Sequence, residues 1–177
     1  MIQIETPRLT LLALSVSQLE TYASHLPDLS QELGMPISGD TSSPGVQRAL
    51  QLKLEYMRAL PETDHPWFTY WLLIQRLDPA GVGLAGFKGL PNPVGEVSIG
   101  YGMDAGHQNK GYMTEAVRFL AGWAFKRADC QVIIAEILKT NLASMRVMEK
   151  VGARRVRQDE NEVVYHLTRA GWMGSPA

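Results

Sequence analysis

The amino-acid sequence predicts an α/β (α+β) fold built on one mixed, mostly antiparallel sheet of about seven strands with four helices. Segments with strand and helix periodicity alternate along the 177 residues, and three consecutive strand-like segments are joined by short turns. No repeat or long linker divides the chain. We therefore expect a single domain over residues 1–170, followed by a C-terminal tail over residues 171–177.

The first part of the chain predicts one strand, two helices and then three strands. Residues 2–14 read as a strand that Pro7 interrupts. Apolar side chains at helical spacing predict the two helices, on either side of a loop rich in Gly, Ser and Pro. The helices span residues 15–26 and 46–60, and the loop spans residues 34–45. The three strands, which we expect to form an antiparallel meander, span residues 67–75, 82–88 and 95–103.

The period of the apolar residues changes after residue 103. Helical spacing over residues 111–126 and 141–150 predicts two more helices, the second with Asn141 as its N-cap and Gly152 just beyond its end. Between them, the β-branched run 131–138 predicts a buried central strand. Residues 154–158 and 162–168 predict a closing hairpin.

Composition excludes several functional classes. Lys and Arg number 17 and Asp and Glu 18, so the net charge of −1 gives no general attraction to nucleic acid or to anionic membranes. Cys130 is the single cysteine and there are four histidines, so we expect neither a disulfide framework nor a metal site. The sequence has no run of 18 apolar residues, and its start is unlike a signal peptide. A cytoplasmic protein is the resulting expectation.

Two glycine-containing segments could bind phosphate groups. Residues 81–86 match G-x-G-x-x-G, but the Pro-containing segment after them cannot form the helix that a dinucleotide site requires. Residues 108–116 instead lie between a predicted strand and a predicted helix. A glycine there lets backbone N–H groups converge on an anion, and the helix N-terminus and Lys110 add positive charge. The alternative is that Gly111 simply begins a helix after a loop.

The same region carries a family resemblance. Residues 96–116, EVSIGYGMDAGHQNKGYMTEA, resemble the acetyl-CoA-binding region of the GNAT superfamily of N-acetyltransferases, whose pattern is Gln/Arg-x-x-Gly-x-Gly/Ala. Residues 135–153 resemble the second signature of the family, in which an Asn opens a helix that ends in a Gly. Residues 5–11, ETPRLTL, resemble the first strand of the ribosomal-protein (RimJ/RimL) branch. The resemblance extends over residues 5 to about 168.

The resemblance implies a sheet that splays between its fourth and fifth strands, with acetyl-CoA bound at the opening as cosubstrate. The pantetheine arm would pair with the end of the fourth strand, and Asn141 would reach the pantetheine or the neighbouring backbone. The pyrophosphate would lie on the amides of the following loop. Arg146 and Lys150 are candidates for the 3′-phosphate, and a solvated helix face is the equal alternative for both. Met113 stands where the family prefers Gly or Ala and could crowd the pyrophosphate. The implied cofactor residues are Tyr101, Gly102, Met103, Gln108, Asn109, Lys110, Gly111, Tyr112, Met113, Thr114 and Asn141.

The implied chemistry is direct acetyl transfer to a primary amine, which must lose a proton before it can attack. Many family members stabilise the leaving thiolate with a Tyr seven residues after the Asn, where this sequence has Met148. Ser144, three residues after the Asn as in the RimJ/RimL branch, is our candidate for that role. Glu96 is the candidate general base, and Glu136 is a second one. Ordinary local hydrogen bonds or ion pairs are the alternative for all three residues.

The sequence thus predicts an acetyl-CoA-dependent N-acetyltransferase acting on a peptide or protein N-terminus or on a small amine. The alternative is a catalytically weak CoA-binding sensor or interaction protein with the same fold. We expect a monomer or homodimer, with no nucleic-acid partner.

Overall fold

The computed structural model describes residues 2–173. Across these residues one eight-stranded sheet runs in the order β1-β2-β3-β4-β5-β6-β8-β7. Its strands are β1 (Gln3–Glu5), β2 (Leu9–Ala13), β3 (Trp71–Gln75), β4 (Gly81–Phe87), β5 (Glu96–Met103), β6 (Val132–Leu138), β7 (Arg154–Gln158) and β8 (Glu162–Thr168). All neighbouring strands are antiparallel except β5 and β6, which are parallel. The predicted mixed, mostly antiparallel sheet is therefore confirmed.

The strand count differs from the prediction because the segment around Pro7 turns back on itself. β1 and β2 are separate strands that pair antiparallel, so the sheet has eight strands within residues 2–173 rather than about seven. The amide of Leu9 donates to the hydroxyl of Thr6 across the turn, and the Thr6 amide donates to the carbonyl of Leu9. The strands that sequence analysis counted as fourth and fifth are consequently β5 and β6.

The described residues form seven α-helices rather than four. They are α1 (Val16–Ser24), α2 (Leu26–Leu33), α3 (Pro44–Ala59), α4 (His65–Phe68), α5 (Tyr112–Ala124), α6 (Leu142–Lys150) and α7 (Arg169–Met173). Two single 3₁₀ turns, η1 (Glu62–Asp64) and η2 (Ala105–His107), precede α4 and α5. The extra helices are α2, α4 and α7, each eight residues or shorter.

The predicted strand over residues 67–75 is wrong in its first part. Pro66 lies in the first turn of α4, where its fixed backbone angle favours helix, so Trp67 and Phe68 are helical. β3 begins only at Trp71, whose indole N–H donates to the carbonyl of Pro66.

At the C-terminal end of the described residues, Trp172 of α7 packs against Phe125, with ring centroids 5.8 Å apart. Residues 174–177 of the expected tail lie outside the described residues.

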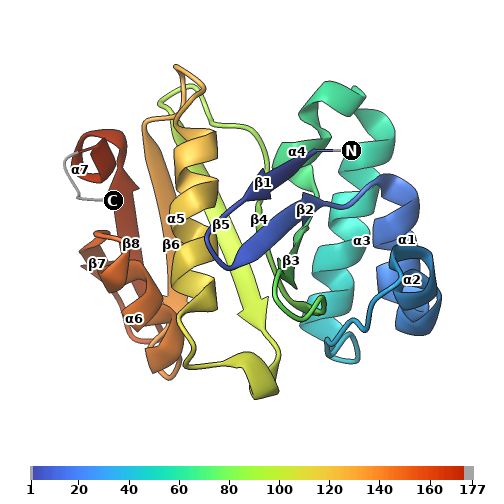
Figure 1. The fold of residues 1–177 in the computed structure, drawn as a ribbon. Helices are drawn as coiled ribbons and strands as arrows, with labels where there is room; N and C mark the ends of the chain where they lie inside the picture. Colours follow the sequence, from blue (N-terminus) through green and yellow to red (C-terminus); the bar gives the residue numbers. More distant parts are fainter. Residues whose placement is uncertain (1, 174–177) are drawn as a thin grey trace.

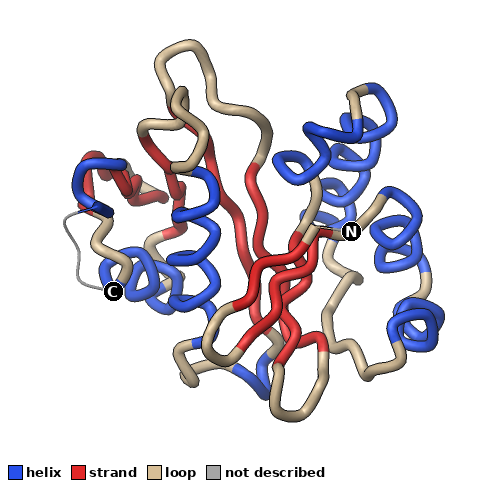
Figure 2. Tube along the Cα trace, turned by 45° about the horizontal axis from the view of Figure 1, so that its top comes forward, coloured by secondary structure: helices blue, strands red, loops and turns tan. Residues whose placement is uncertain are grey.

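Helices cover both faces of the sheet. On one face, α5 buries a stripe of small and aliphatic side chains that includes Ala116, Val117 and Leu120, all fully buried. On the other face, α1, α2 and α3 pack against Leu72 and Leu84 of the N-terminal strands. Figure 1 shows these three helices on the side of the molecule away from α6 and α7, and Figure 2 shows the same separation in a second view.

The sheet opens between β5 and β6, as the resemblance implied. The two strands pair at only three positions, from Glu96 opposite Val132 to Ser98 opposite Ile134. Beyond Ser98, β5 pairs only with β4, and β6 pairs only with β8. The edges of β5 and β6 that face each other are therefore unpaired over the rest of their length.

The buried side chain of Lys53 connects α3 to the sheet through hydrogen bonds. The side chain of Lys53 is only 8% exposed, and its Nζ donates to the carbonyl oxygens of Phe68, Thr69 and Phe87 at 3.0, 3.2 and 2.6 Å. It also lies 4.4 Å from the ring centroid of Tyr70. Burial lowers the pKa of Lys53 from 10.5 to about 7, and the nearby charge of Lys88 acts in the same direction.

This burial predicts a pH-dependent stability. Between the folded pKa of about 7 and the unfolded value of 10.5, the unfolded state binds the extra proton, so the free energy of unfolding rises with pH. We expect this residue to contribute a slope of roughly 1 kcal/mol per pH unit, which Lys53→Met removes. Urea unfolding at several pH values from about 7.5 to 8.5, below the ordinary pKa of 9.0 for Cys130, measures it. Equal slopes for the two proteins would contradict the prediction.

Candidate functional site

A cavity of about 430 Å³ lies where β5 and β6 separate, a volume within the range of small-molecule sites. Three segments enclose it: the end of β5, the loop that leads into α5, and the first turns of α6. The lining residues are Tyr101, Gly102, Met103, His107, Gln108, Asn109, Gly111, Tyr112, Met113, Thr114, Asn141, Ala143, Ser144, Arg146, Val147 and Lys150. The cavity therefore brings together every predicted cofactor residue except Lys110, and it also includes Ser144.

Unpaired backbone amides line one wall of this cavity. The loop reaches α5 through two residues with left-handed backbone, Asn109 with φ of 61° and Gly111 with φ of 79°. Gly111 is the N-cap of α5, and no side chain caps this helix. Within residues 2–173, no hydrogen bond uses the amides of residues 111–114, which belong to the N-cap and first turn. These N–H groups and the helix dipole together favour an anion at this end of the cavity.

The end of β5 forms a second wall. Past Ser98 its outer edge lacks a neighbouring strand, so an extended ligand could hydrogen-bond there as an added strand does. A Cβ built on Gly100 or Gly102 would meet nothing within 4 Å, so the sheet face opposite α5 is open at both positions.

The first turn of α6 forms the third wall and is tied to β5. Asn141 caps the helix because its Oδ1 accepts from the amide of Ser144 at 3.0 Å. The hydroxyl of Tyr101 donates to the carbonyl of Ser144 at 3.1 Å, across the gap between the strands. Burial raises the pKa of Tyr101 far above its ordinary value of 10.0, so this hydroxyl stays protonated. The Ser144 hydroxyl, half-buried on the cavity wall, has no hydrogen-bond partner among residues 2–173.

Met113 does not crowd the cavity as the sequence suggested. Its side chain is only 8% exposed and belongs to the core cluster under α5. The first turn of α5 therefore keeps the amide of Met113 at the cavity while its side chain packs in the core. Lys110 lies outside the lining, with its carbonyl bound by Arg8 and its own residue exposed.

The two candidate bases lie apart from the cavity lining. Glu96 begins β5 where the strand is still paired with β6, and its carboxylate accepts from the side chain of Asn92 at 3.3 Å. Glu136 lies on β6 beyond the separation and pairs with Lys88 at 3.1 Å. Alternation along the strands places both carboxylates on the face opposite α5, because Val97 and Ala135 next to them are buried in the core under α5.

Three lining residues, His107, Ala143 and Val147, have no cofactor or catalytic role in the sequence prediction, which takes His107 as a loop residue beside the site. His107 has its Nδ1 3.0 Å from the carboxylate of Asp104, which orients its ring in the loop. Ala143 and Val147 line the α6 wall. A single loop histidine and two small apolar helix residues carry no signal in a sequence, so only the packing of α6 against the loop identifies them.

Comparison with known proteins agrees with this geometry. The family model of the acetyltransferase (GNAT) domain matches residues 8–154. The uncharacterised N-acetyltransferase YjdG of Bacillus subtilis (strain 168) is 28% identical over 152 residues, which are 86% of this chain and 89% of that protein. The chain therefore belongs to the GNAT acetyltransferase family.

Solved structures of other acetyltransferases share the fold of this chain. The ribosomal-protein-S5-alanine acetyltransferase from Vibrio fischeri superposes with a TM-score of 0.67 and 17% identity, over 97% of this chain and 99% of that one. The aminoglycoside acetyltransferase AAC(6′)-Ib, solved with coenzyme A, gives a TM-score of 0.63 and 17% identity, over 93% and 97% of the two chains. Among residues 2–173, no helix has the length and apolar character needed to cross a membrane.

The hydrogen bond between Tyr101 of β5 and Ser144 of α6 can be tested by measuring the free energy of unfolding. Tyr101→Phe leaves the ring in place but removes the hydroxyl that donates to the Ser144 carbonyl, so we expect the free energy of unfolding to fall by about 1 kcal/mol. Urea denaturation measures this change. Tyr56→Phe is the matched control because the Tyr56 side chain is half exposed and contacts Phe68 only through its ring. Equal free energies of unfolding for the two variants would contradict a stabilising hydrogen bond between Tyr101 and Ser144.

Proposed function

We propose that this protein transfers the acetyl group of acetyl-CoA to a primary amine, with the CoA bound in the cavity between β5 and β6. The observation that carries the proposal is the row of unpaired amides at residues 111–114, which opens on the cavity beside the separated strands. A pyrophosphate is the group that best satisfies several convergent N–H donors at a helix N-terminus.

The remaining walls support the rest of the CoA molecule. The free edge of β5 at Tyr101, Gly102 and Met103 offers backbone groups to the amides of pantetheine, and the side-chain NH₂ of Asn141 is available beside them. Arg146 and Lys150 add positive charge at the α6 wall, where the 3′-phosphate would lie. The cavity thus holds an anion by local donors although the whole chain has a net charge of −1.

In the proposed reaction, the acceptor nitrogen attacks the thioester carbonyl, the N–C bond forms and the C–S bond breaks. The departing sulfur carries negative charge, and the Ser144 hydroxyl donates a hydrogen bond or a proton to it. The proton that leaves the amine passes to a carboxylate, for which we propose Glu96, with Glu136 as the second candidate. Both lie on the sheet face where Gly100 leaves open space, which is the side proposed for the acceptor.

The acceptor we favour is the α-amino group of a peptide or protein. This rests on the resemblance of residues 5–11 to the ribosomal-protein branch and on the fold shared with a ribosomal-protein acetyltransferase. A small-molecule amine is the alternative, and mass spectrometry of products from a panel of peptides and small amines distinguishes them.

The first test is binding and turnover by the wild-type protein. We expect CoA to raise the melting temperature and adenosine, which lacks the pyrophosphate, to do so far less. Release of thiol from acetyl-CoA in the presence of amines then separates an enzyme from a CoA-binding sensor. An unchanged melting temperature at millimolar CoA would contradict the proposed function, and binding without thiol release would favour the sensor.

The role of Ser144 predicts a specific kinetic change. Ser144→Ala removes the donor to the leaving thiolate, so kcat falls by about tenfold or more while KM for acetyl-CoA changes less. Steady-state kinetics with varied acetyl-CoA measures both parameters. Ser24→Ala on α1, where the hydroxyl only bonds the Glu20 carbonyl of its own helix, is the control. A kcat equal to that of the wild type would exclude Ser144 from the chemistry.

The base is identified by the pH dependence of the rate. We expect Glu96→Gln to move the acid limb of the kcat/KM profile, because the deprotonated carboxylate is the active form. Glu136→Gln is the parallel variant, and Glu160→Gln in the exposed β7–β8 turn is the control. A shift for Glu136→Gln alone would assign the role to β6, and three unaltered profiles would exclude both carboxylates.

A further inference from the structure

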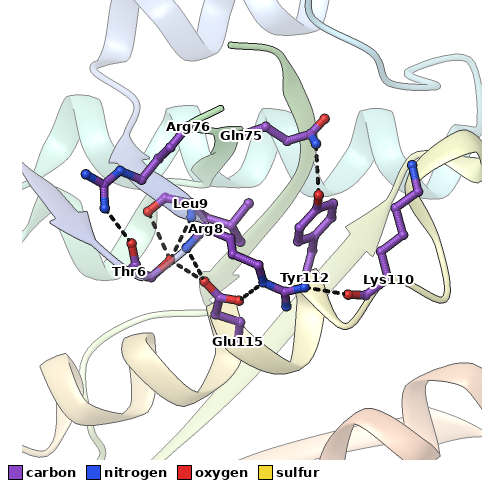
Figure 3. Close-up of polar contacts among 8 residues, drawn as sticks. All are labelled: Thr6, Arg8, Leu9, Gln75, Arg76, Lys110, Tyr112 and Glu115. Atoms are coloured by element: carbon purple, nitrogen blue, oxygen red, sulfur yellow. Dashed lines mark hydrogen bonds and ion pairs between the residues drawn. The ribbon is translucent and has the colours of Figure 1, made fainter. Parts of the chain in front are cut away.

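A polar network outside the cavity joins the turn between β1 and β2 to the loop that begins α5. Figure 3 shows the side chain of Arg8 extending from this turn to the carboxylate of Glu115 and to the backbone carbonyl of Lys110. Glu115 and Lys110 lie 107 and 102 positions from Arg8 in the sequence, so only the folded chain brings them to it. None of the predicted roles uses Arg8 or Glu115.

Both carboxylate oxygens of Glu115 accept hydrogen bonds. One carboxylate oxygen accepts from the Thr6 hydroxyl at 2.7 Å and from the Arg8 amide at 2.8 Å, and the other accepts from Arg8 Nε at 2.6 Å. The side chain is only 11% exposed. Partial burial acts to raise the pKa of Glu115, but the hydrogen bonds from Thr6 and Arg8 outweigh it and lower the pKa. Glu115 therefore holds both the backbone and the guanidinium of Arg8 in one place.

Arg8, held in this way, contacts the loop at three points. Its Nη1 donates to the carbonyl of Lys110 at 2.9 Å, and its Cζ lies 4.8 Å from the ring centroid of Tyr112. A Cβ on Gly111 would come within 3.3 Å of its Nη2, so the guanidinium packs directly against that glycine. Tyr112 is fixed from its other end, because its hydroxyl accepts from the side chain of Gln75 at 3.0 Å.

The direction of one peptide group follows from these contacts. Within residues 2–173 there is no cis peptide, and the C=O and N–H of a trans peptide point in opposite directions. Since the carbonyl of Lys110 points to Arg8, the N–H of Gly111 in the same peptide points away from Arg8. Gly111 is also the residue that lines the cavity at this point.

We propose that Arg8, held by Glu115, is a positioning residue that keeps the Lys110–Gly111 peptide and the first amides of α5 directed into the cavity for the pyrophosphate of CoA. This proposal rests on the proposed function, because it assigns the ligand of the same cavity. Arg8 itself binds protein groups through both Nε and Nη1 and acts on the ligand through the loop.

Two variants distinguish a positioning role of Arg8 from a simple effect of charge on CoA binding. Glu115→Gln removes a negative charge close to the anion site, so Coulomb attraction alone would strengthen CoA binding. The positioning role instead predicts weaker binding, roughly tenfold or more, because Arg8 loses its charged partner. Arg8→Lys keeps the positive charge but has no planar fork to reach a carboxylate and a carbonyl together, so it also weakens CoA binding roughly tenfold.

Arg76→Lys is the matched control. The Arg76 side chain also binds the β1–β2 turn, through the carbonyl of Thr6 and the carboxylate of Glu5, but among residues 2–173 it has no hydrogen bond or ion pair with the loop. We expect its CoA affinity to stay within about twofold of the wild type. In the Arg8→Lys and Glu115→Gln double variant, the loss should not exceed the larger single loss, because both substitutions break the same contact.

Isothermal titration with CoA measures the affinities, and urea unfolding of each variant confirms a folded protein. In turnover, KM for acetyl-CoA should rise by a larger factor than kcat falls, which general destabilisation would not produce. CoA affinity of Glu115→Gln or Arg8→Lys equal to or above that of the wild type would overturn the proposal, as would an equal loss in Arg76→Lys. A wild-type protein that does not bind CoA would instead overturn the proposed function.

Discussion

The separation of β5 from β6 is the constraint on which the candidate site depends. Three paired positions hold the two strands together, and beyond them the backbone of each strand turns an unpaired edge to the other. Unpaired strand edges inside a protein are unfavourable unless water or a ligand satisfies them. The hydrogen bond from Tyr101 to the carbonyl of Ser144 and the packing of α6 against the core connect the two sides of the opening. The fold thereby leaves the β6-facing edge of β5 without a neighbouring strand past Ser98.

Electrostatics at the opening is local. The chain has a net charge of −1, yet the α5 N-terminus, Arg146 and Lys150 face one cavity. Glu115, the acid nearest to the α5 N-terminus in sequence, is bound by Arg8 and Thr6, which compensates its charge. We therefore propose that local donors at this opening hold a polyanionic ligand, although the net charge of the whole protein gives no general attraction to polyanions.

Much of the fold and of the candidate site could be predicted from the sequence, because the motifs that indicate them are short and local. The strand–loop–helix unit around Gly111 carries its own motif, and Asn141 opens α6 as its capping side chain indicates. The errors have non-local causes. Trp67 and Phe68 look like strand residues, but Pro66 and the burial of Trp67 against Phe87 and Trp123 place them in a short helix. The Arg8–Glu115 pair spans 107 positions, so no window of sequence could have found it.

The central claim is that CoA binds in the opening between β5 and β6 with its pyrophosphate on the first amides of α5. Titration of the ¹⁵N-labelled protein with CoA, followed by amide chemical shifts, tests it most directly. We expect the largest shifts at residues 111–114, with further shifts at residues 101–103 on the β5 edge. Saturating CoA that leaves these amides unshifted, or that shifts a different surface such as α3, would exclude CoA from this opening.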